Sequence, residues 1–320
     1  LHPLLKKVYA NRGIKHLGQV EYSLKHLIDF SLLKDIDKAA SIVANAVRQG
    51  KRLLVVGDFD ADGATSCAVM IRCLKSFGLN SVDYLVPNRF DFGYGLSPQI
   101  VDVASEYMSG LKPDLIVTVD NGISSIEGVA RANELGIEVV VTDHHLAGDD
   151  LPAAAAIINP NQPGCSFPAK TIAGVGVAFY LMLAVRASLR ETGWFDDIRS
   201  EPNMAAFLDL VALGTVADVV PLDDNNRVLV EHGLQRIRAN KACAGINALL
   251  TIAGKSIEQC SSQDFGFIIG PRLNAAGRLD DMSLGIECLL SDDHEEALRH
   301  AATLNQMNQQ RRRIEGDMLE

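Results

Sequence analysis

The chain has 320 residues, of which 48% are hydrophobic and 22% charged, and its formal net charge is −10. This acidic balance excludes a generally basic coat for nucleic acid but permits a local basic groove, and no apolar run is long enough for a transmembrane helix. The absence of such a run predicts no membrane association. The six cysteines lie far apart without a C-x-x-C pair, which predicts free thiols in a reducing cytoplasm.

The first 50 residues predict a helical lead-in. Residues 1–33 are irregularly apolar and carry several lysines and histidines. Residues 35–49 form an amphipathic pattern with an alanine-rich face, and Gly50 follows as a C-terminal cap. We therefore expect a short N-terminal segment, 1–50, that packs on the domain after it.

An acidic turn follows the first predicted strand. Residues 53–56, Leu-Leu-Val-Val, predict a buried parallel strand, because such strands are apolar on both faces. Asp58, Asp60 and Asp62 come next at alternate positions, and an apolar-periodic run over 64–79 predicts a helix. Three carboxylates this close repel one another unless cations lie among them. A lone D-x-D-x-D also fits a solvated turn, so the interpretation depends on the later strands.

Strands and helices alternate from there to about residue 160. Further strands are predicted at 82–87, 115–119, 139–142 and 153–158, with helices at 97–108 and 124–135. This alternation is typical of an α/β fold with a doubly wound, mainly parallel sheet, which we place at residues 51–160.

Two later strands also end in residues that can bind metal. Asp120 follows strand 115–119, and Asp143, His144 and His145 follow strand 139–142. In open parallel sheets, ligands bind beyond the carboxyl ends of the strands. A pair of surface histidines would explain one such ending, but three endings at one edge predict a site.

The rest of the chain predicts a helical part, 170–290. Helices are expected at 171–190, 205–217, 226–240 and 246–252, and Asp218 follows the second of these.

Two later segments differ from this pattern. Residues 270–279, with two glycines and two arginines, are expected to interrupt the helices as a loop. A polar helix from residue 293 to the end is more typical of a bridge between domains than of a core element. We therefore expect 291–320 to be a long connector helix.

Five carboxylates and one imidazole converge in this scheme as candidate metal ligands: Asp58, Asp60, Asp62, Asp120, Asp218 and His144. Five negative charges are nearly neutralised by two divalent cations, whereas one magnesium ion would leave the site over-charged. Hard oxygen ligands suit magnesium or manganese, and the imidazole favours manganese. Two such ions support hydrolysis of a phosphoester or phosphoanhydride.

Four short motifs in the chain resemble, in order, those of the DHH phosphoesterase superfamily. They are the D-x-D-x-D at 58–62, Asp-Asn-Gly at 120–122, Asp-His-His at 143–145 and Gly-Thr-x-Ala-Asp at 214–218. The segments 88–96, 218–222 and 270–279 further resemble the bacterial single-strand-specific 5′→3′ DNA exonucleases of that superfamily. The resemblance extends from about residue 23 to the final helix and implies DNA repair and recombination as the setting.

The resemblance also implies roles for individual residues. Asp120 would bridge two manganese (or magnesium) ions, with Asp58 and Asp60 on one ion and Asp62, His144 and Asp218 on the other. The catalytic residues would be Asp60, Asp120, His145 and Asp143. His145 would touch the scissile phosphate, and Asp143 would orient the His145 ring. The DNA strand would be held by Arg89, Tyr94, Arg272, Asn274 and Arg278.

The same resemblance sets expectations for the whole protein. Residues 51–290 would be the catalytic domain, and the final helix would lead to a second domain absent from this chain. The substrate would be a single-stranded DNA with a 5′ end, degraded to mononucleotides. A monomer is expected, with a single-strand-binding protein and a helicase as partners.

Other functions remain open at this point. A pyrophosphatase, oligoribonuclease or cyclic-dinucleotide phosphodiesterase of the same superfamily commonly has a histidine four residues before the D-x-D pair, where this chain has Val56. A non-catalytic nucleic-acid-binding scaffold would be expected to have lost at least one ligand, and none is missing. A dinucleotide-binding enzyme would need a G-x-G-x-x-G after the first strand, which is absent.

Overall fold

The computed structural model describes residues 2–87, 95–279 and 281–318. Two residues predicted to bind substrate, Arg89 and Tyr94, lie outside these ranges. Within them, no helix is both long and apolar enough to cross a membrane.

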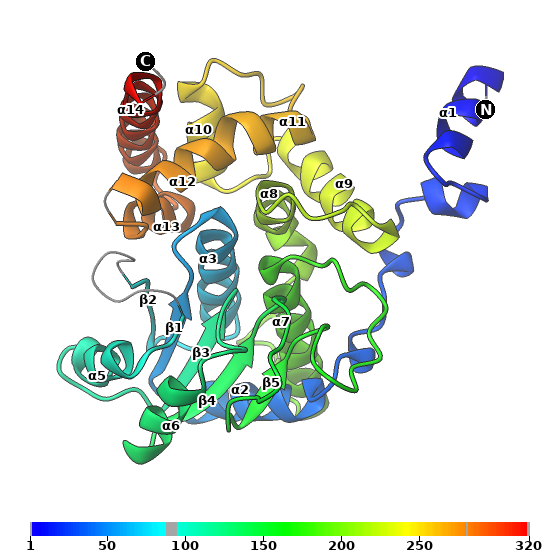
Figure 1. The fold of residues 1–320 in the computed structure, drawn as a ribbon. Coiled ribbons are helices and arrows are strands. Elements are labelled where there is room, and N and C mark those ends of the chain that lie inside the picture. Colours follow the sequence, from blue (N-terminus) through cyan, green and yellow to red (C-terminus); the bar gives the residue numbers. More distant parts are fainter. Residues whose placement is uncertain (1, 88–94, 280, 319–320) are drawn as a thin grey trace.

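A five-stranded parallel sheet forms the centre of the first half (Figure 1). Its strands run in the order β2-β1-β3-β4-β5. Their bounds are β1 Leu53–Gly57, β2 Val82–Leu85, β3 Leu115–Val119, β4 Glu138–Thr142 and β5 Ala156–Ile158. The order reverses between β1 and β3, and this switch point is where ligands bind in open α/β sheets. The predicted doubly wound sheet is therefore confirmed, and its strand ends lie as expected.

Helices cover both faces of the sheet. One apolar core lies between the sheet and the helices α2 (Ile36–Gln49), α3 (Ala61–Ser76) and α7 (Gly174–Glu191). A second core lies under α5 (Pro98–Tyr107) and α6 (Ile126–Glu134). Alternate residues of β1 enter the two cores, which is why the strand is apolar throughout.

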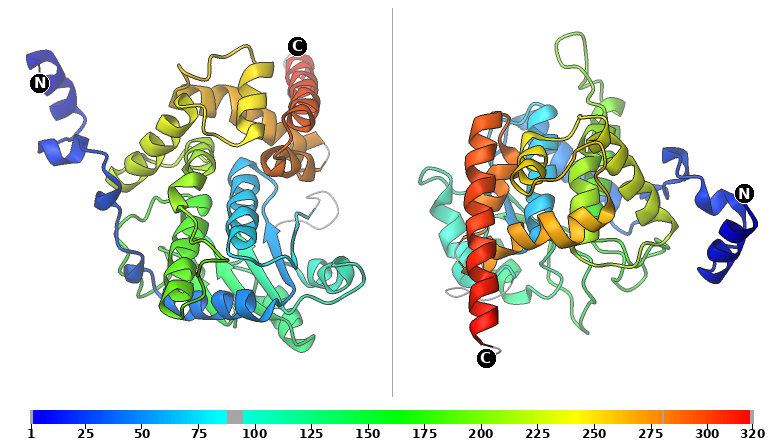
Figure 2. Two further views of the ribbon diagram at one scale, coloured as in Figure 1. Left: turned by 180° about the vertical axis from the view of Figure 1, so that it is seen from behind. Right: turned by 90° about the horizontal axis from the view of Figure 1, so that it is seen from above.

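The second half of the chain is helical and lies beyond the carboxyl edge of the sheet (Figures 1 and 2). Its helices are α8 Leu208–Ala217, α9 Asp224–Arg238, α10 Ala244–Ile252, α11 Ser262–Asp264, α12 Gly270–Leu279, α13 Ser283–Leu290 and α14 His294–Asp317. A π-helical turn, Phe265–Ile269, leads directly into α12. The polar helix α14 is half-covered, since it packs on α10, α12 and α13.

One sequence-based prediction about this half is wrong. Residues 270–279 are a helix and not a loop. Pro271 directly follows the π-helical turn, where the regular i→i−4 pattern is already broken, since the Gly270 N–H donates to the Phe265 carbonyl five residues earlier. Gly277 is required by packing, because a Cβ there would lie 1.9 Å from the Phe59 carbonyl oxygen.

The N-terminal helix α1, Pro3–Asn11, lies apart from the body of the molecule (Figure 2). It has no buried residue. The 3₁₀ turns Leu17–Val20, Leu24–His26 and Phe30–Leu32 connect it to α2, and the Tyr22 carbonyl accepts a hydrogen bond from His232 of α9. The lead-in therefore contacts the helical half before it reaches the sheet.

Candidate metal centre

Asp58 and Asp60 lie in the turn between β1 and α3, residues 58–60, which we call the metal loop. The Asp60 carboxylate caps α3 by accepting hydrogen bonds from the backbone N–H groups of Asp62 (2.9 Å) and Gly63 (3.0 Å). The helix therefore begins at Ala61, three residues before its predicted start. The cap also holds the two side chains of this turn at the switch point of the sheet.

Asp120 follows β3 on the other side of the switch point. Its backbone is left-handed, with φ +60°, which is uncommon for a residue other than glycine. The buried carboxamide of Asn121 holds this turn by donating to the carbonyls of Val56 in β1 and Val119 in β3. The backbone strain is thus concentrated at a residue that the site uses.

The carboxylate of Asp62, in the first turn of α3, lies at the N-terminus of α7, a helix from a distant part of the chain. Its carboxylate accepts hydrogen bonds from the backbone N–H groups of Gly174 (2.6 Å) and Val175 (2.9 Å). A side chain at Gly174 would collide with the Asp120 carboxylate, its Cβ lying 2.5 Å from Oδ1. Glycine is therefore needed where α7 approaches the carboxylate cluster.

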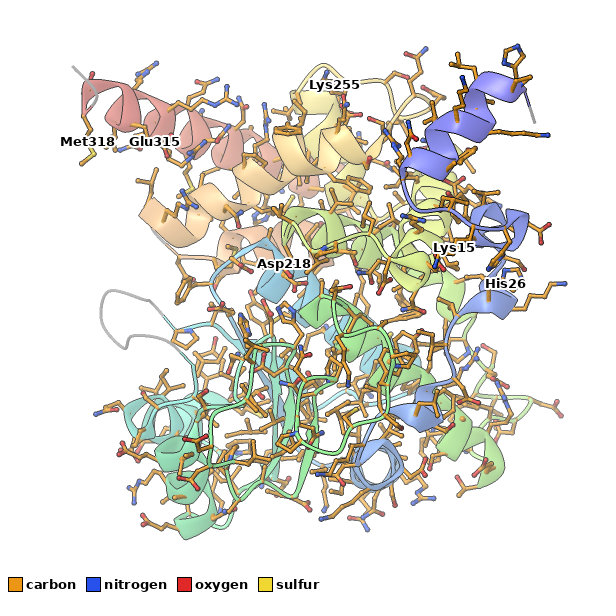
Figure 3. The ribbon with its side chains drawn as sticks, turned by 45° about the vertical axis from the view of Figure 1, so that its right-hand side comes forward. Lys15, His26, Asp218, Lys255, Glu315 and Met318 are labelled. Atoms are coloured by element: carbon orange, nitrogen blue, oxygen red, sulfur yellow. The ribbon has the colours of Figure 1, made fainter. Side chains whose placement is uncertain are left out.

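Asp218 reaches the same place from the end of α8, between the sheet and the helical half (Figure 3). Val219, immediately after it, has φ +62°, a strained value for a β-branched residue. One turn earlier, a Cβ at Gly214 would lie 2.9 Å from an Asp62 oxygen, so this helix also approaches the cluster closely.

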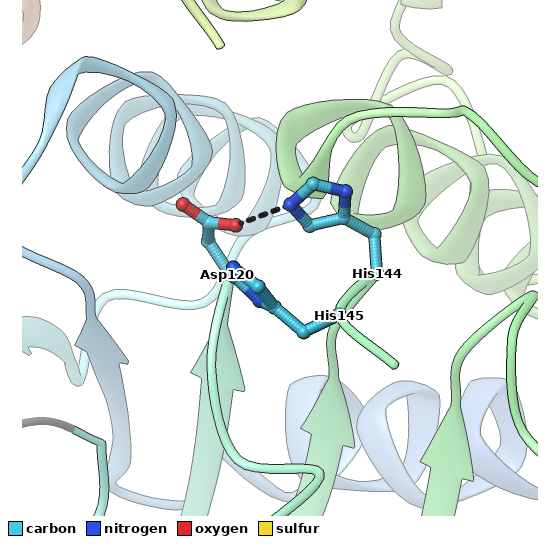
Figure 4. Close-up of side chains that lie close together, drawn as sticks. All are labelled: Asp120, His144 and His145. Atoms are coloured by element: carbon cyan, nitrogen blue, oxygen red, sulfur yellow. Dashed lines mark ion pairs between the residues drawn. The ribbon is translucent and has the colours of Figure 1, made fainter. Parts of the chain in front are cut away.

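His144 points its Nε2 atom into the cluster. This nitrogen lies 3.1 Å from Asp120 Oδ1 and 3.6 Å from Asp218 Oδ2 (Figure 4). The ring also makes a hydrogen bond with the backbone of Ile172, and burial lowers the pKa of His144. A neutral imidazole oriented by a backbone carbonyl is the form that binds metal ions.

Asp143 and His145 form a second, adjacent pair. Asp143 is buried, and its Oδ1 lies 2.7 Å from Nδ1 of the exposed His145 ring. The same carboxylate accepts backbone hydrogen bonds from Ile123, His144 and His145. These bonds lower the pKa of Asp143 despite its burial, and the Asp143 carboxylate raises the pKa of His145.

Burial and like charge dominate the electrostatics of the remaining carboxylates. Burial, with Asp60 close by, raises the pKa of Asp58 to about 7 and the pKa of Asp218 to about 7. Burial and the neighbouring aspartates also raise the pKa values of Asp62 and Asp120 well above their usual range. Cations among these groups would remove the repulsion and restore the charged forms.

The six predicted ligands form two groups whose members lie within 4.8 Å of one another: Asp58, Asp60 and Asp120, and Asp62, His144 and Asp218. Asp120 and His144 also form a third such group with His145. His144 Nε2 and Asp218 Oδ2 are buried and have no hydrogen-bond partner among the described residues. Buried polar atoms normally find partners, so this arrangement fits bound cations. Oxygen-rich sets with one imidazole suit manganese and magnesium. The structure thus brings together all six predicted ligands.

Of the three predicted substrate-binding residues on α12, Asn274 contacts the segment that carries the aspartates. Asn274 Oδ1 accepts a hydrogen bond from the backbone N–H of Ala61 (2.7 Å), so it fixes the start of α3. Arg272 is partly buried and donates to Asn305 of α14 and to the Ile268 carbonyl, which joins the two helices. Arg278 is half-exposed, 3.9 Å from a carboxylate oxygen of Glu315.

Sequence reasoning missed several residues that position the two histidines. The carboxamide of Asn159 donates to the His145 carbonyl, and that of Asn161 donates to the His144 carbonyl. Both residues lie in the proline-rich loop after β5, whose sequence indicated turns but no functional residue. The sequence indicated Asn121 only as part of the Asp-Asn-Gly motif and did not predict that it holds the turn after β3.

Comparisons with known proteins agree with this geometry. The DHH family, N-terminal domain, matches residues 52–215. The chain is 56% identical over 319 residues to the single-stranded-DNA-specific exonuclease RecJ of Escherichia coli, covering 99% of this chain and 55% of that protein. Against RecJ of Thermus thermophilus in complex with Mn²⁺, the TM-score is 0.79 at 33% identity, covering 97% of this chain and 42% of that chain. A crystal structure of exonuclease RecJ bound to manganese matches with TM-score 0.78 and 35% identity, covering 90% of this chain and 69% of that chain.

The fold and the cluster define a doubly wound α/β protein with a carboxylate–histidine metal centre at its switch point. The chain belongs to the DHH family, and within that family to the RecJ group. The predicted family and fold are thus confirmed. The chain spans about half the length of the curated relatives it matches.

Proposed function

We propose that this chain carries the metal-dependent catalytic site of an exonuclease that degrades single-stranded DNA from its 5′ end to mononucleotides. The observation that carries the proposal is the pair of ligand groups at the strand ends, in a chain 56% identical to a single-stranded-DNA-specific exonuclease.

Each ligand group would hold one cation, manganese or magnesium. Asp58 and Asp60 would bind the first and Asp62, His144 and Asp218 the second, with Asp120 between them. Support comes from Asp120 itself, which belongs to the first group and lies 3.1 Å from His144 of the second. Two ions at such a site supply an activated water and neutralise charge on both oxygens of a phosphoryl displacement.

The remaining chemistry falls to His145. Asp143 holds the ring and favours its protonated form, so His145 can donate a hydrogen bond to a phosphate oxygen or a proton to a leaving oxygen. Asp143 acts through His145, as a positioning residue.

Arg278 and Asn274, on α12, are proposed to face the DNA strand, together with Arg89, Tyr94 and Arg272. Planar guanidinium groups suit bidentate phosphate contacts. The hydrogen bonds of Arg272 and Asn274 to the protein indicate that their first task is to hold α12 against the metal loop and α14.

The same proposal covers the domain organisation and the cellular setting of the whole protein. Residues 51–290 would form the catalytic domain after the lead-in 1–50, and 291–320 would connect it to another domain of the whole protein. A cytoplasmic monomer that works with a single-strand-binding protein and a helicase in DNA repair is proposed on the resemblance to RecJ alone. The superfamily alternatives lack support, because Val56 is buried in the second core and offers no ligand.

Digestion of end-labelled single strands tests the function. With manganese, a 5′-labelled strand should release labelled mononucleotide at once, whereas a 3′-labelled strand should shorten progressively. Pyrophosphate and a cyclic dinucleotide should remain intact. Preferred hydrolysis of either small substrate would contradict the proposal, and Asp120→Asn should remove the activity.

A further inference from the structure

A cavity of about 530 Å³ opens beside His145, on the side of the sheet covered by α5 and α6. Its volume lies within the range of about 300–1,000 Å³ typical of small-molecule sites. Asp143 and His145 line it, so it shares a wall with the metal centre. Figure 4 shows His145 beside Asp120 and His144 at the strand ends.

Part of the cavity wall is aliphatic. Leu96, Pro98, Ile123 and Ile126 line it from the segments that begin α5 and α6, and Leu96 and Ile123 are buried. Ile126 differs from these two, because it is 44% exposed, which is high for an isoleucine, and it lines the cavity. An exposed apolar side chain at the edge of a polar catalytic site is a candidate contact for an apolar part of a substrate.

The polar groups that line the cavity indicate which part of a substrate the cavity would hold. Two helix N-termini border the cavity and would attract an anion, but the N-terminus of α6 carries Glu127, which also lines it. The Ser97 hydroxyl is occupied as the cap of α5, and the Ser125 hydroxyl accepts from the Leu96 N–H. An acidic side chain repels phosphate and accepts hydrogen bonds from N–H donors, and the exposed Ile126 beside it offers an apolar surface. This combination fits a nucleobase.

We propose that this cavity is a nucleoside subsite, in which Ile126 packs against the base of the nucleotide whose phosphate lies at the metal centre. The inference rests on the proposed function and adds a place for the base. Aliphatic packing on the face of a base does not depend on its identity, so the subsite accepts all four bases. Ile126 would be a specificity residue that distinguishes a nucleotide from a bare sugar phosphate.

Binding of two ligands to the manganese-loaded chain tests the subsite. Thymidine 5′-monophosphate and 2-deoxyribose 5-phosphate share the sugar phosphate, and only the first has a base. Calorimetric titration of the wild type should give about tenfold tighter binding of the nucleotide. Ile126→Ser should reduce this ratio to about twofold while leaving the affinity for deoxyribose phosphate unchanged.

Val103→Ser provides the matched control. Val103 is an aliphatic residue of α5, 41% exposed and outside the cavity lining, so its variant should keep the tenfold ratio. Equal affinities of the two ligands in the wild type, or an undiminished ratio in Ile126→Ser, would overturn the subsite and leave the proposed function intact. Failure of both ligands to bind would contradict the subsite and the phosphate-binding role of the metal centre together.

Discussion

The Asp143 carboxylate holds the His145 ring with a 2.7 Å contact and also binds three backbone N–H groups, so this pair is rigid before any substrate arrives. The neighbouring His144 has the opposite character, because burial keeps it neutral and its Nε2 faces three aspartates. These contacts support the proposal that two consecutive histidines serve two chemistries, metal ligand and proton donor.

His145→Ala should separate these roles. Turnover should fall by about 10²–10⁴-fold, the usual contribution of a general acid–base group, while manganese binding is retained. Single-turnover cleavage and calorimetry measure the two properties. His26→Ala, at an exposed histidine of the lead-in, should change neither (Figure 3). Loss of a manganese ion in His145→Ala would instead make His145 a ligand.

The sequence was sufficient to predict that six candidate ligands lie close together, because each lies at or near the end of a recognisable strand or helix. It could not reveal their supports. The two N–H groups that hold Asp62 belong to α7, 112 and 113 residues further along the chain. The carboxamides of Asn159 and Asn161 likewise act through tertiary contacts that leave no local pattern.

At the scale of elements, α12 shows where sequence patterns mislead. Its two glycines and one proline are typical of a loop, and local propensity supports that interpretation. Packing overrides propensity here, because the helix can approach the Phe59 carbonyl only where residue 277 has no side chain. The strands and the other long helices had no such conflict, so their types were predictable and only their bounds shifted.

Gly277→Ala tests this packing. The added methyl group must push α12 away from the metal loop, which should destabilise the protein by about 1–3 kcal/mol and weaken manganese binding. Thermal unfolding and manganese titration provide the measurements.

Gly316→Ala is the control, since a Cβ in that part of α14 meets nothing within 4 Å. It should be neutral or slightly stabilising, by up to about 1 kcal/mol, because alanine favours helix. Equal behaviour of the two variants would contradict the proposed contact between α12 and the metal loop.

At the scale of the whole molecule, the carboxylate cluster links stability to pH. The pKa of both Asp58 and Asp218 is raised to about 7, mainly by burial, from a usual value of 3.8. Without metal, the folded chain therefore holds more protons than the unfolded chain between about pH 4 and pH 7. The contribution of these two carboxyl groups to stability is greatest below this window and falls as the pH rises through it. The raised pKa of His145 acts in the same direction at higher pH.

We therefore expect the metal-free protein to lose about 1–4 kcal/mol of unfolding free energy between pH 5 and pH 8, at about 1.4 kcal/mol per pKa unit. Manganese should reverse most of this loss, because it binds the charged carboxylates of the folded state only. Denaturant unfolding with chelator and with manganese, at several pH values, measures both effects. If the free energy of unfolding depended on pH in the same way with chelator and with manganese, the carboxylate cluster would not be the source of the pH dependence.

The account depends most on a two-ion centre that shares Asp120. Calorimetric titration with manganese tests this claim most directly. The wild type should bind two ions, and Asp120→Asn should bind at most one with high affinity, because the Asp120 carboxylate is proposed to bind both ions. Asp102→Asn, at an exposed aspartate of α5 paired with Arg131, should still bind two. An undiminished two-ion stoichiometry in Asp120→Asn, or a single ion in the wild type, would contradict the account.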